Sequence, residues 1–376
     1  MACDIRIRNG TVIDPLTGSA SGRDVCVHQG ILVDPALAGD AAWDFDADGL
    51  LVMPGLIDFH VHAASQLSGE GFPVDALLPL GVTSAVDAGT SGSATWQAFV
   101  MIAAACAVRM KAYLDVWPSG SSMHQRVDPA EWDPGAVREC FARYPDFLLG
   151  LKLRFGKPFL KHHDIRSLTA MLDLAESLGV PVAVHCTDAP VRLEEICDLL
   201  GPGDVLVHCY EGTGNTILTS EKTVSQAVRD ARARGVIMDA CNGRMNWTFD
   251  VAEAALEEGF APDVISSDMT RQNMYRDPVW GLPYLMSKYL MLGMDLTDIV
   301  RCVTLTPAKL MRLESEVGGL GHGMAGDIAV FSMENRPVRF SDTRGETRTG
   351  NALLVPQLTV LGGRVMYRSM DSLDRG

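Results

Sequence analysis

The stretch GLIDFHVH, residues 55–62, is an apolar run that ends in two histidines one residue apart. Such a run is typical of a buried strand, and buried imidazole rings need polar partners. Side chains alternate between the two faces of a strand, which places Asp58, His60 and His62 on one face and Ile57, Phe59 and Val61 on the other. The stretch therefore predicts a strand whose polar face points toward a site.

Seven more apolar runs follow it and alternate with segments of helical spacing. Helical patterns cover residues 165–179 and 221–235, and Gly235 is expected to cap the second helix. Eight strands, each followed by a helix, predict an α/β fold of the (β/α)8 TIM barrel type, with a doubly wound parallel sheet as the alternative. The seven runs are GVTSAVDAG (81–89), MKAYLDVW (110–117), LLGLKLR (148–154), PVAVHCT (181–187), DVLVHCY (204–210), GVIMDACN (235–242) and DVISSDM (263–269).

The two ends of the chain have a different pattern. Short, alternating segments such as DIRIRNGTVIDP (4–15) and LTVLGGRVMY (358–367) are separated by Asn-Gly, Gly-Gly and Asp-Pro turns. We expect both termini to build one small β-sandwich beside the barrel. The predicted division is residues 1–52 and 322–376 for the sandwich and 53–321 for the barrel.

Composition and charge narrow the range of partners. The 376 residues are 47% hydrophobic, which suffices for a large core. Because 32 basic against 47 acidic residues give a net charge of -15, the chain would repel nucleic acid and anionic membrane surfaces. We therefore expect a small-molecule substrate, with no nucleic acid and no membrane as partner. A homo-oligomer is compatible with a barrel of this kind.

Two further features indicate a cytoplasmic protein. The longest apolar run, FVMIAAACAV (99–108), is too short to span a bilayer and is predicted to be a buried helix, and the start of the chain has no secretory signal pattern. The nine cysteines include no C-x-x-C pair, which favours reduced core residues over disulfides. Cys186 and Cys209 directly follow histidines, but alternation points them outward under the helices.

Polar side chains recur where the predicted strands end. Because the carboxyl ends of parallel strands meet at one face of a barrel, these residues should come together there. Imidazole and carboxylate groups are the usual zinc ligands, and a paired site can hold a bridging hydroxide. The alternation of side chains along each strand predicts which of these residues point into the barrel. They are His60, His62, Lys152, Arg154, His185, His208, Tyr210 and Asp268.

Lys152 is unusual among candidate metal ligands, because an ammonium group repels cations. Two metal ions in a desolvated pocket would lower the pKa of the amine, and a neutral amine can react with CO2 to give a bridging carbamate. A salt bridge at the barrel mouth and a Schiff-base lysine are the alternatives for Lys152.

HVH after strand one, a lysine after strand four, histidines after strands five and six and an aspartate after strand eight resemble the amidohydrolase superfamily of binuclear metal hydrolases. The resemblance covers nearly the whole chain. It implies two divalent metal ions, zinc or manganese, the first held by His60, His62 and Asp268 and the second by His185 and His208. It further implies that carbamylated Lys152 bridges the two ions and that Asp268 is the general base.

Within this superfamily the chain is most similar to the amidohydrolase/deacetylase or dihydroorotase-like branch. The similar segments are EEGFAPDVISSDMT (257–270), LPYLMSKYLMLGM (282–294) and VTLTPAKLM (303–311). Dihydroorotases usually carry HxHxR after strand one, whereas this chain reads HVHAAS (60–65). The branch often has Gly-His-Gly after strand seven, whereas this chain reads ACNGRMNW (240–247).

We therefore expect a metal-dependent hydrolase of amide or ester bonds, of the deacetylase type, acting on N-acyl amino acids or O-acyl hydroxy acids. In this expected mechanism the metal ions would activate a water molecule for attack on the substrate carbonyl, and Asp268 would pass its proton to the leaving group. The substrate carboxylate needs a cation, for which Arg154, Arg244 and Arg271 are candidates, and Tyr210 could donate to the oxyanion. The alternatives are a cyclic amidase similar to dihydroorotase or hydantoinase, a metal-dependent lyase, and a scaffold without catalysis.

Overall fold

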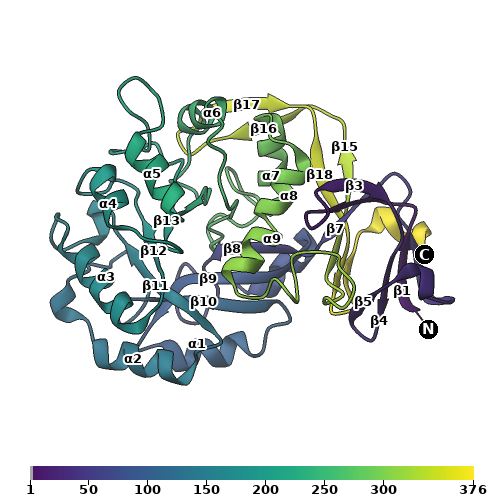
Figure 1. Cartoon of the computed structure of the whole chain (residues 1–376), viewed down its shortest axis with the longest axis horizontal. Coiled ribbons are helices and arrows are strands. Elements are labelled where there is room, and N and C mark those ends of the chain that lie inside the picture. The colour runs from purple at the N-terminus through teal and green to yellow at the C-terminus, as the bar shows by residue number, and fades with distance from the viewer. Residues whose placement is uncertain (1–2) are drawn as a thin grey trace.

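A seven-stranded parallel sheet forms the centre of the fold in the computed structural model, which describes residues 3–376 (Figure 1). Its order, β14-β13-β12-β11-β10-β9-β8, pairs each strand with its neighbour in the sequence. These strands are buried on both faces, which explains their nearly continuous apolar sequences. They are β8 (Leu56–Val61), β9 (Val82–Gly92), β10 (Arg109–Asp115), β11 (Leu148–Arg154), β12 (Val182–His185), β13 (Val205–Val207) and β14 (Ile237–Asp239).

The segment 264–269 lies between the two edge strands of this sheet. Asp239 of β14 forms a parallel bridge with Val264, and Val61 of β8 forms one with Met269. The sequence predicts an eighth strand here. Within residues 3–376 the structure has only isolated bridges in this segment, but they lie where the strand was expected and connect both edges. The arrangement is of the TIM-barrel type.

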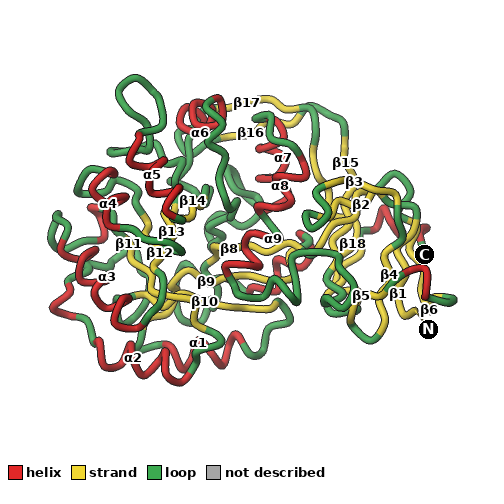
Figure 2. The backbone as a smooth tube through the Cα atoms, viewed as in Figure 1, coloured by secondary structure: helices red, strands yellow, loops and turns green. Residues whose placement is uncertain are grey.

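Helices surround the parallel sheet (Figure 2). The predicted patterns over 165–179 and 221–235 correspond to α3 and α5, and Gly235 ends α5 with a φ of 104° as expected. The second helix starts late because Ser225 caps it. The α-helices are α1 (Trp96–Ala103), α2 (Pro134–Arg143), α3 (Arg166–Leu178), α4 (Leu193–Leu199), α5 (Gln226–Arg234), α6 (Phe249–Glu257), α7 (Leu282–Met291), α8 (Leu296–Cys302) and α9 (Leu305–Leu310). Short 3-10 helices are η1 (Pro35–Leu37), η2 (Val74–Leu80), η3 (Pro129–Glu131), η4 (Lys157–Phe159) and η5 (Met370–Arg375).

The apolar run 99–108 was predicted as one buried helix, and this is only partly correct. Helix α1 ends at Ala103, and Met101 within it is 68% exposed. Residues 3–376 contain no helix with both the length and the apolar character needed to cross a bilayer.

The packing of β8 differs from the predicted alternation. Ile57 and Phe59 belong to a cluster with Tyr113 and Ala183 of other strands, whereas Val61 packs in the large cluster under the helices. The register of β8 against β9 shifts between Asp58 and Val61. Such an irregularity breaks the two-residue period, so the prediction that Ile57, Phe59 and Val61 share one face is wrong.

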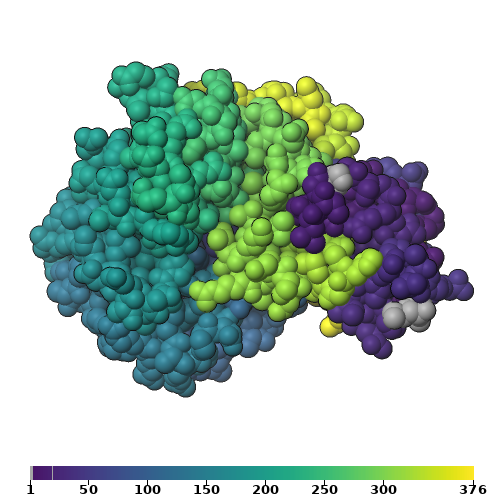
Figure 3. Space-filling view, in the orientation of Figure 1, coloured from purple at the N-terminus to yellow at the C-terminus, as the bar shows by residue number. Residues whose placement is uncertain are grey.

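Two further sheets lie at one end of the molecule, where the N-terminal segments are purple in Figure 3; the first contains only N-terminal strands, and the second combines strands from both ends of the chain. One sheet has the order β5-β4-β1-β6 and the other the order β19-β18-β15-β7-β2-β3. Apolar side chains of both sheets, such as Val27 and Phe45 of the first and Val330 and Leu358 of the second, share one core cluster. The strands are β1 (Cys3–Arg8), β2 (Thr11–Asp14), β3 (Ser19–Gly22), β4 (Val25–His28), β5 (Ile31–Val33), β6 (Ala41–Asp46), β7 (Leu51–Pro54), β15 (Ile328–Glu334), β18 (Leu353–Leu361) and β19 (Arg364–Arg368).

A hairpin extends from the C-terminal part to the barrel. Strands β16 (Val338–Ser341) and β17 (Thr347–Gly350) form it, and its turn contacts the segment that follows β14. Thr343 donates from its backbone nitrogen to Trp247 O at 3.2 Å. This contact fixes a loop that borders the site described next.

Candidate metal centre and active site

A cavity of about 420 Å³ lies at the carboxyl ends of the parallel strands. Barrel enzymes keep their chemistry at this face. Every residue predicted as a metal ligand lines the cavity, together with two of the predicted arginines: His60, His62, Lys152, His185, His208, Asp268, Arg154 and Arg244. Their roles remain predictions, but the fold brings all eight side chains to one place.

His60, His62 and Asp268 form the tightest part of this group. Asp268 Oδ1 is 3.3 Å from His62 Nε2 and 3.7 Å from His60 Nε2. Each of the three offers a ligand atom within 4.8 Å of the others. Such spacing fits one metal ion bound by two imidazoles and a carboxylate.

The charge state of Asp268 follows from two opposing effects. Burial alone would raise the pKa of its carboxyl, but the hydrogen bond with His62 and the nearby His60 and His208 lower that pKa overall. Asp268 is thereby held as a carboxylate. Its φ of 49° is unusual for a residue other than glycine and aims the side chain into the cavity.

Lys152 lies on the cavity floor with its ammonium group next to a histidine. The residue is 1% exposed, and its Nζ is 3.2 Å from His60 Nε2. Burial lowers the pKa of Lys152, and burial with the charge of Lys152 lowers the pKa of His60 well below its usual value. A buried amine in contact with histidine rather than with a carboxylate is expensive as a cation, which fits a lysine that functions in a neutral or modified form.

The predicted histidine ligands are oriented through their other ring nitrogens. His62 Nδ1 contacts Thr90 Oγ1 at 3.2 Å, and this hydroxyl donates to Asp87 Oδ2 at 2.7 Å. His208 Nδ1 donates to Cys241 O at 2.7 Å. Metal-binding histidines usually have such partners, because these fix the tautomer and the ring.

Asp239 and His185 each have a buried polar atom without a hydrogen-bond partner in the described part of the chain. Asp239 Oδ2 lies 3.6 Å from His60 Nδ1. This oxygen is buried and has no hydrogen-bond partner within residues 3–376. His185 Nε2 is also buried without a hydrogen-bond partner there. An imidazole nitrogen in this state, at the wall of a cavity, is suited to a metal ion.

His208 lines the cavity, on the side where alternation placed it, but its backbone does not have the conformation of a regular strand. Val205 and Val207 of β13 point into the barrel, so a regular strand would turn His208 outward. A φ of 64° at His208 reverses the direction of its side chain. Burial lowers its pKa to about 4, so the ring is neutral at neutral pH and able to bind a metal.

The same reversal overturns the prediction for Tyr210. This side chain is fully buried in the cluster under the helices, and its hydroxyl donates to Phe260 O at 2.6 Å. It does not line the cavity of His208. The expected outward position of Cys186 and Cys209 is confirmed, since both pack in the same outer cluster.

The three predicted arginines have three different surroundings. Arg154 lies 3.5 Å from Glu70 Oε2, and its guanidinium carbon is 3.6 Å from the centre of the Phe159 ring. Arg244 is exposed at the cavity wall and has no salt bridge in the part of the chain described. Arg271 is exposed outside the cavity lining, and only its backbone nitrogen reaches Glu70 O. Arg271 follows the lining residue Thr270 but does not itself line the cavity, so its role as a cation for the substrate stays a prediction.

Sequence reasoning missed several residues of the site. Glu70 and Asn246 line the cavity, and Cys241 offers its thiol within 4.8 Å of ligand atoms of His60 and His208. Glu70 lies in a loop eight residues after His62, where no local pattern marks it. Cys241 follows the seventh strand, so its place at a strand end was the available signal.

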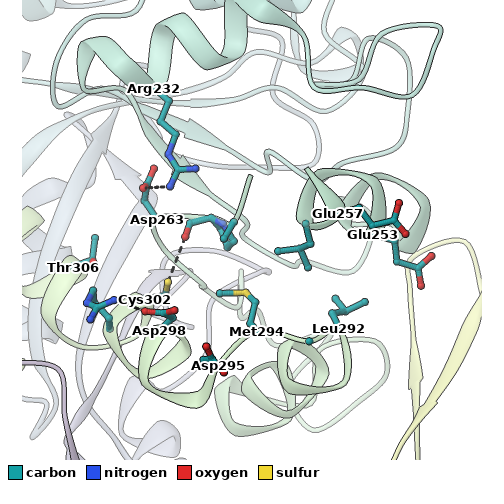
Figure 4. Close-up of a pocket in the computed structure, with 15 residues that line it drawn as sticks. Arg232, Glu253, Glu257, Asp263, Leu292, Met294, Asp295, Asp298, Cys302 and Thr306 are labelled. Atoms are coloured by element: carbon teal, nitrogen blue, oxygen red, sulfur yellow. Dashed lines mark hydrogen bonds and ion pairs between the residues drawn. The ribbon is translucent and has the colours of Figure 1, made fainter. Parts of the chain in front are cut away.

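A second cavity of about 560 Å³ lies between α6 and α8 (Figure 4). It contains no histidine. Its arginines are satisfied by carboxylates, as in the pair of Arg232 and Asp263 at 2.7 Å, and the thiol of Cys302 donates to Pro262 O at 3.4 Å. Its polar groups therefore offer no equivalent of the cluster at the strand ends.

Comparisons with known proteins agree with this geometry. A deacetylase of Agrobacterium fabrum is 32% identical over 333 residues, which cover 86% of this chain and 81% of that protein. A deacetylase of Enterococcus faecalis is 27% identical and covers 97% of this chain and 99% of its own length.

Solved structures extend the similarity to the whole fold. The structure of an adenine deaminase superposes with a TM-score of 0.90 at 26% identity over 98% of this chain and 100% of the other. The structure of a dihydroorotase superposes with a TM-score of 0.87 at 28% identity, over 97% of this chain and 99% of the other. The profile of the amidohydrolase family matches residues 165–365, and the chain belongs to this family of hydrolytic enzymes.

Proposed function

We propose that the protein is a metal-dependent deacetylase that hydrolyses N-acyl amino acids or O-acyl hydroxy acids. The observation that carries this proposal is the cavity in which four histidines, Lys152 and Asp268 meet beside the exposed cation of Arg244. The relatives named deacetylases support the choice of reaction. An anionic substrate fits because Arg244 has no carboxylate partner in the described part of the chain.

We assign two divalent metal ions, zinc or manganese, to this cavity. His60, His62 and Asp268 would hold the first, His185 and His208 the second, and a carbamate on Lys152 would bridge them. The unpartnered Nε2 of His185 and the lowered pKa of Lys152 support the assignment. When bound, the ions polarise the substrate carbonyl and lower the pKa of the attacking water.

In this proposal the residues of the chain bind the substrate and move the proton. Arg244 pairs with the substrate carboxylate, which places the acyl carbonyl toward the histidines. The ionised Asp268 accepts the proton of the attacking water and delivers it to the leaving nitrogen or oxygen. Met123, Phe159 and Met245 supply an apolar part of the cavity lining, against which the acyl group of the substrate can pack.

A cyclic amidase is the second candidate function. The dihydroorotase structure at a TM-score of 0.87 favours it, since ring opening would use the same ligand set.

We also propose that the two terminal sheets form a β-sandwich from residues 1–52 and 322–376, with 53–321 as the catalytic barrel. The core shared by the two sheets supports this division.

A panel of substrates tests the function. Zinc- and manganese-loaded protein with bicarbonate is incubated with D and L N-acetyl amino acids, O-acetyl hydroxy acids, dihydroorotate and hydantoins. Acetate release that depends on metal is the expected result. Ring opening without acetate release would instead support the cyclic amidase.

A further inference from the structure

Asn246 connects the carboxylate of Asp268 to the hydroxyl of Thr187. Its amide nitrogen donates to Asp268 Oδ2 at 3.3 Å, and its amide oxygen accepts from Thr187 Oγ1 at 3.0 Å. The other carboxylate oxygen, Oδ1, faces His62 and His60. The two oxygens of Asp268 therefore have different partners. The hydrogen bond from Asn246 holds Oδ2 and so keeps Oδ1 directed at the histidines.

The direction of this amide follows from the chemistry of its neighbours. An ionised carboxylate accepts hydrogen bonds and cannot donate one, so the NH2 group of Asn246 must face Asp268. The amide oxygen is then left for Thr187, whose hydroxyl can donate. A reversed amide would place two acceptors against each other.

Gly243 closes the third side of the same contact. A Cβ atom at this position would lie 2.6 Å from Asn246 Nδ2 and 2.6 Å from Asp268 Oδ2. Its φ of 55° is a second reason for glycine. Backbone and amide together enclose Oδ2, which leaves the carboxylate little freedom to rotate.

The loop that carries Asn246 is held from both sides. The backbone nitrogen of Thr248 donates to Tyr210 O at 3.0 Å, and that of Phe249 donates to Asp342 Oδ2 at 3.2 Å. Trp247 is fully buried and donates from its indole nitrogen to Tyr289 at 3.0 Å. The amide therefore starts from a rigid support, which is what accurate positioning requires.

We propose that Asn246 is a positioning residue that sets the rotation of the Asp268 carboxylate, and that Thr187 in turn fixes the amide. The inference rests on the proposed role of Asp268 in proton transfer. A carboxylate that takes a proton from one atom and returns it to another must keep a fixed orientation through both steps. Without the amide, Asp268 could still bind a metal ion, but its carboxylate would spend less time in the orientation that proton transfer requires.

The test compares N246A, the isosteric N246D, T187V and the double variant N246A/T187V. The matched control is N215A, which loses one amide hydrogen bond, from Asn215 to Val191 O, outside the cavity. For each protein we would measure kcat, KM, metal content and Tm. N246D keeps the shape of the side chain but replaces the amide donor with a second carboxyl group against Asp268.

We expect N246A and N246D to lower kcat by about 10- to 100-fold, the usual effect of losing a partner outside the ligand set, with KM and metal content close to wild type. T187V should lower kcat less, and the double variant should be no worse than N246A, because Thr187 acts through Asn246. N215A should retain kcat within about twofold.

A wild-type kcat in N246D, or a double variant whose losses multiply, would overturn the inference. If N246A folds poorly by Tm, T187V carries the test through the same kcat and KM comparison. D268N separates this inference from the proposed function. An inactive D268N beside a fully active N246A refutes only the role of Asn246, whereas a fully active D268N refutes the proton-transfer role itself.

Discussion

Replacing Arg244 with methionine should reduce recognition of the substrate carboxylate. The structure singles out this residue, since Arg154 is paired with Glu70 at 3.5 Å and Arg271 lies outside the cavity lining. Methionine keeps the apolar stem and removes only the charged group. R244M therefore probes the charge with little change in packing.

The expected magnitude follows from the exposure of Arg244. A hydrogen bond to a charged group contributes about 1.5–3 kcal/mol, and the lower end applies because solvent screens an exposed pair. About 1.5 kcal/mol corresponds to roughly a tenfold change in affinity. R244M should therefore bind an anionic substrate roughly tenfold less well.

The assay measures kcat/KM for an N-acetyl amino acid and for the matching N-acetyl amino acid amide, whose carboxylate is neutralised. In R244M the ratio of acid to amide should fall roughly tenfold. R271M is the control and should leave this ratio unchanged, because Arg271 does not line the cavity. An unchanged ratio in R244M would refute the assignment of Arg244 to the carboxylate.

Three other variants test separate parts of the account. D268N should keep its metal content but lose about 10²- to 10⁴-fold in kcat as a proton-transfer group is removed, and near-normal turnover would exclude the role. On the proposed assignment, in which a carbamate on Lys152 would bridge two ions, K152M should bind at most one metal ion per chain, measured by elemental mass spectrometry; two retained ions would contradict the assignment. Burial lowers the pKa of Lys288 to about 7, so between pH 7 and 9 the unfolded chain binds the proton that the folded chain releases. The free energy of unfolding of wild type relative to K288M should thus rise by roughly 2 kcal/mol over this range in urea titrations, and a flat or falling difference would show that Lys288 stays charged.

The clustering of the candidate metal ligands could be predicted from the sequence because these residues occupy the ends of strands. The order of apolar runs fixes where each strand ends, and parallel strands bring these ends together. His60, Lys152 and His185 therefore needed only a correct reading of local patterns. The same patterns predicted α3 and α5 with their glycine ends.

The errors arose where the backbone departs from regular geometry. A φ of 64° at His208 reverses its direction and sends Tyr210 into the core. The register of β8 shifts between Asp58 and Val61, and Ile57 and Phe59 pack in a different cluster from Val61. Neither residue type nor spacing reports such a local conformation.

Long-range contacts were equally invisible in the sequence. Arg154 forms an ion pair with Glu70, which lies in a loop 84 positions earlier in the sequence. Asn246, in the loop before Asp268, donates a hydrogen bond to that carboxylate. Both contacts depend on how the loops fold over the barrel. The sequence therefore identified candidate cations but could not rank them.

The most direct test of the central claim is a crystal grown with zinc and bicarbonate and measured at the zinc absorption edge. The account predicts two anomalous peaks in the cavity, one among His60, His62 and Asp268 and one beside His185 and His208, with extra density on Lys152 Nζ between them. A single peak, a peak at the thiol of Cys241, or unmodified Lys152 beside two ions would contradict it.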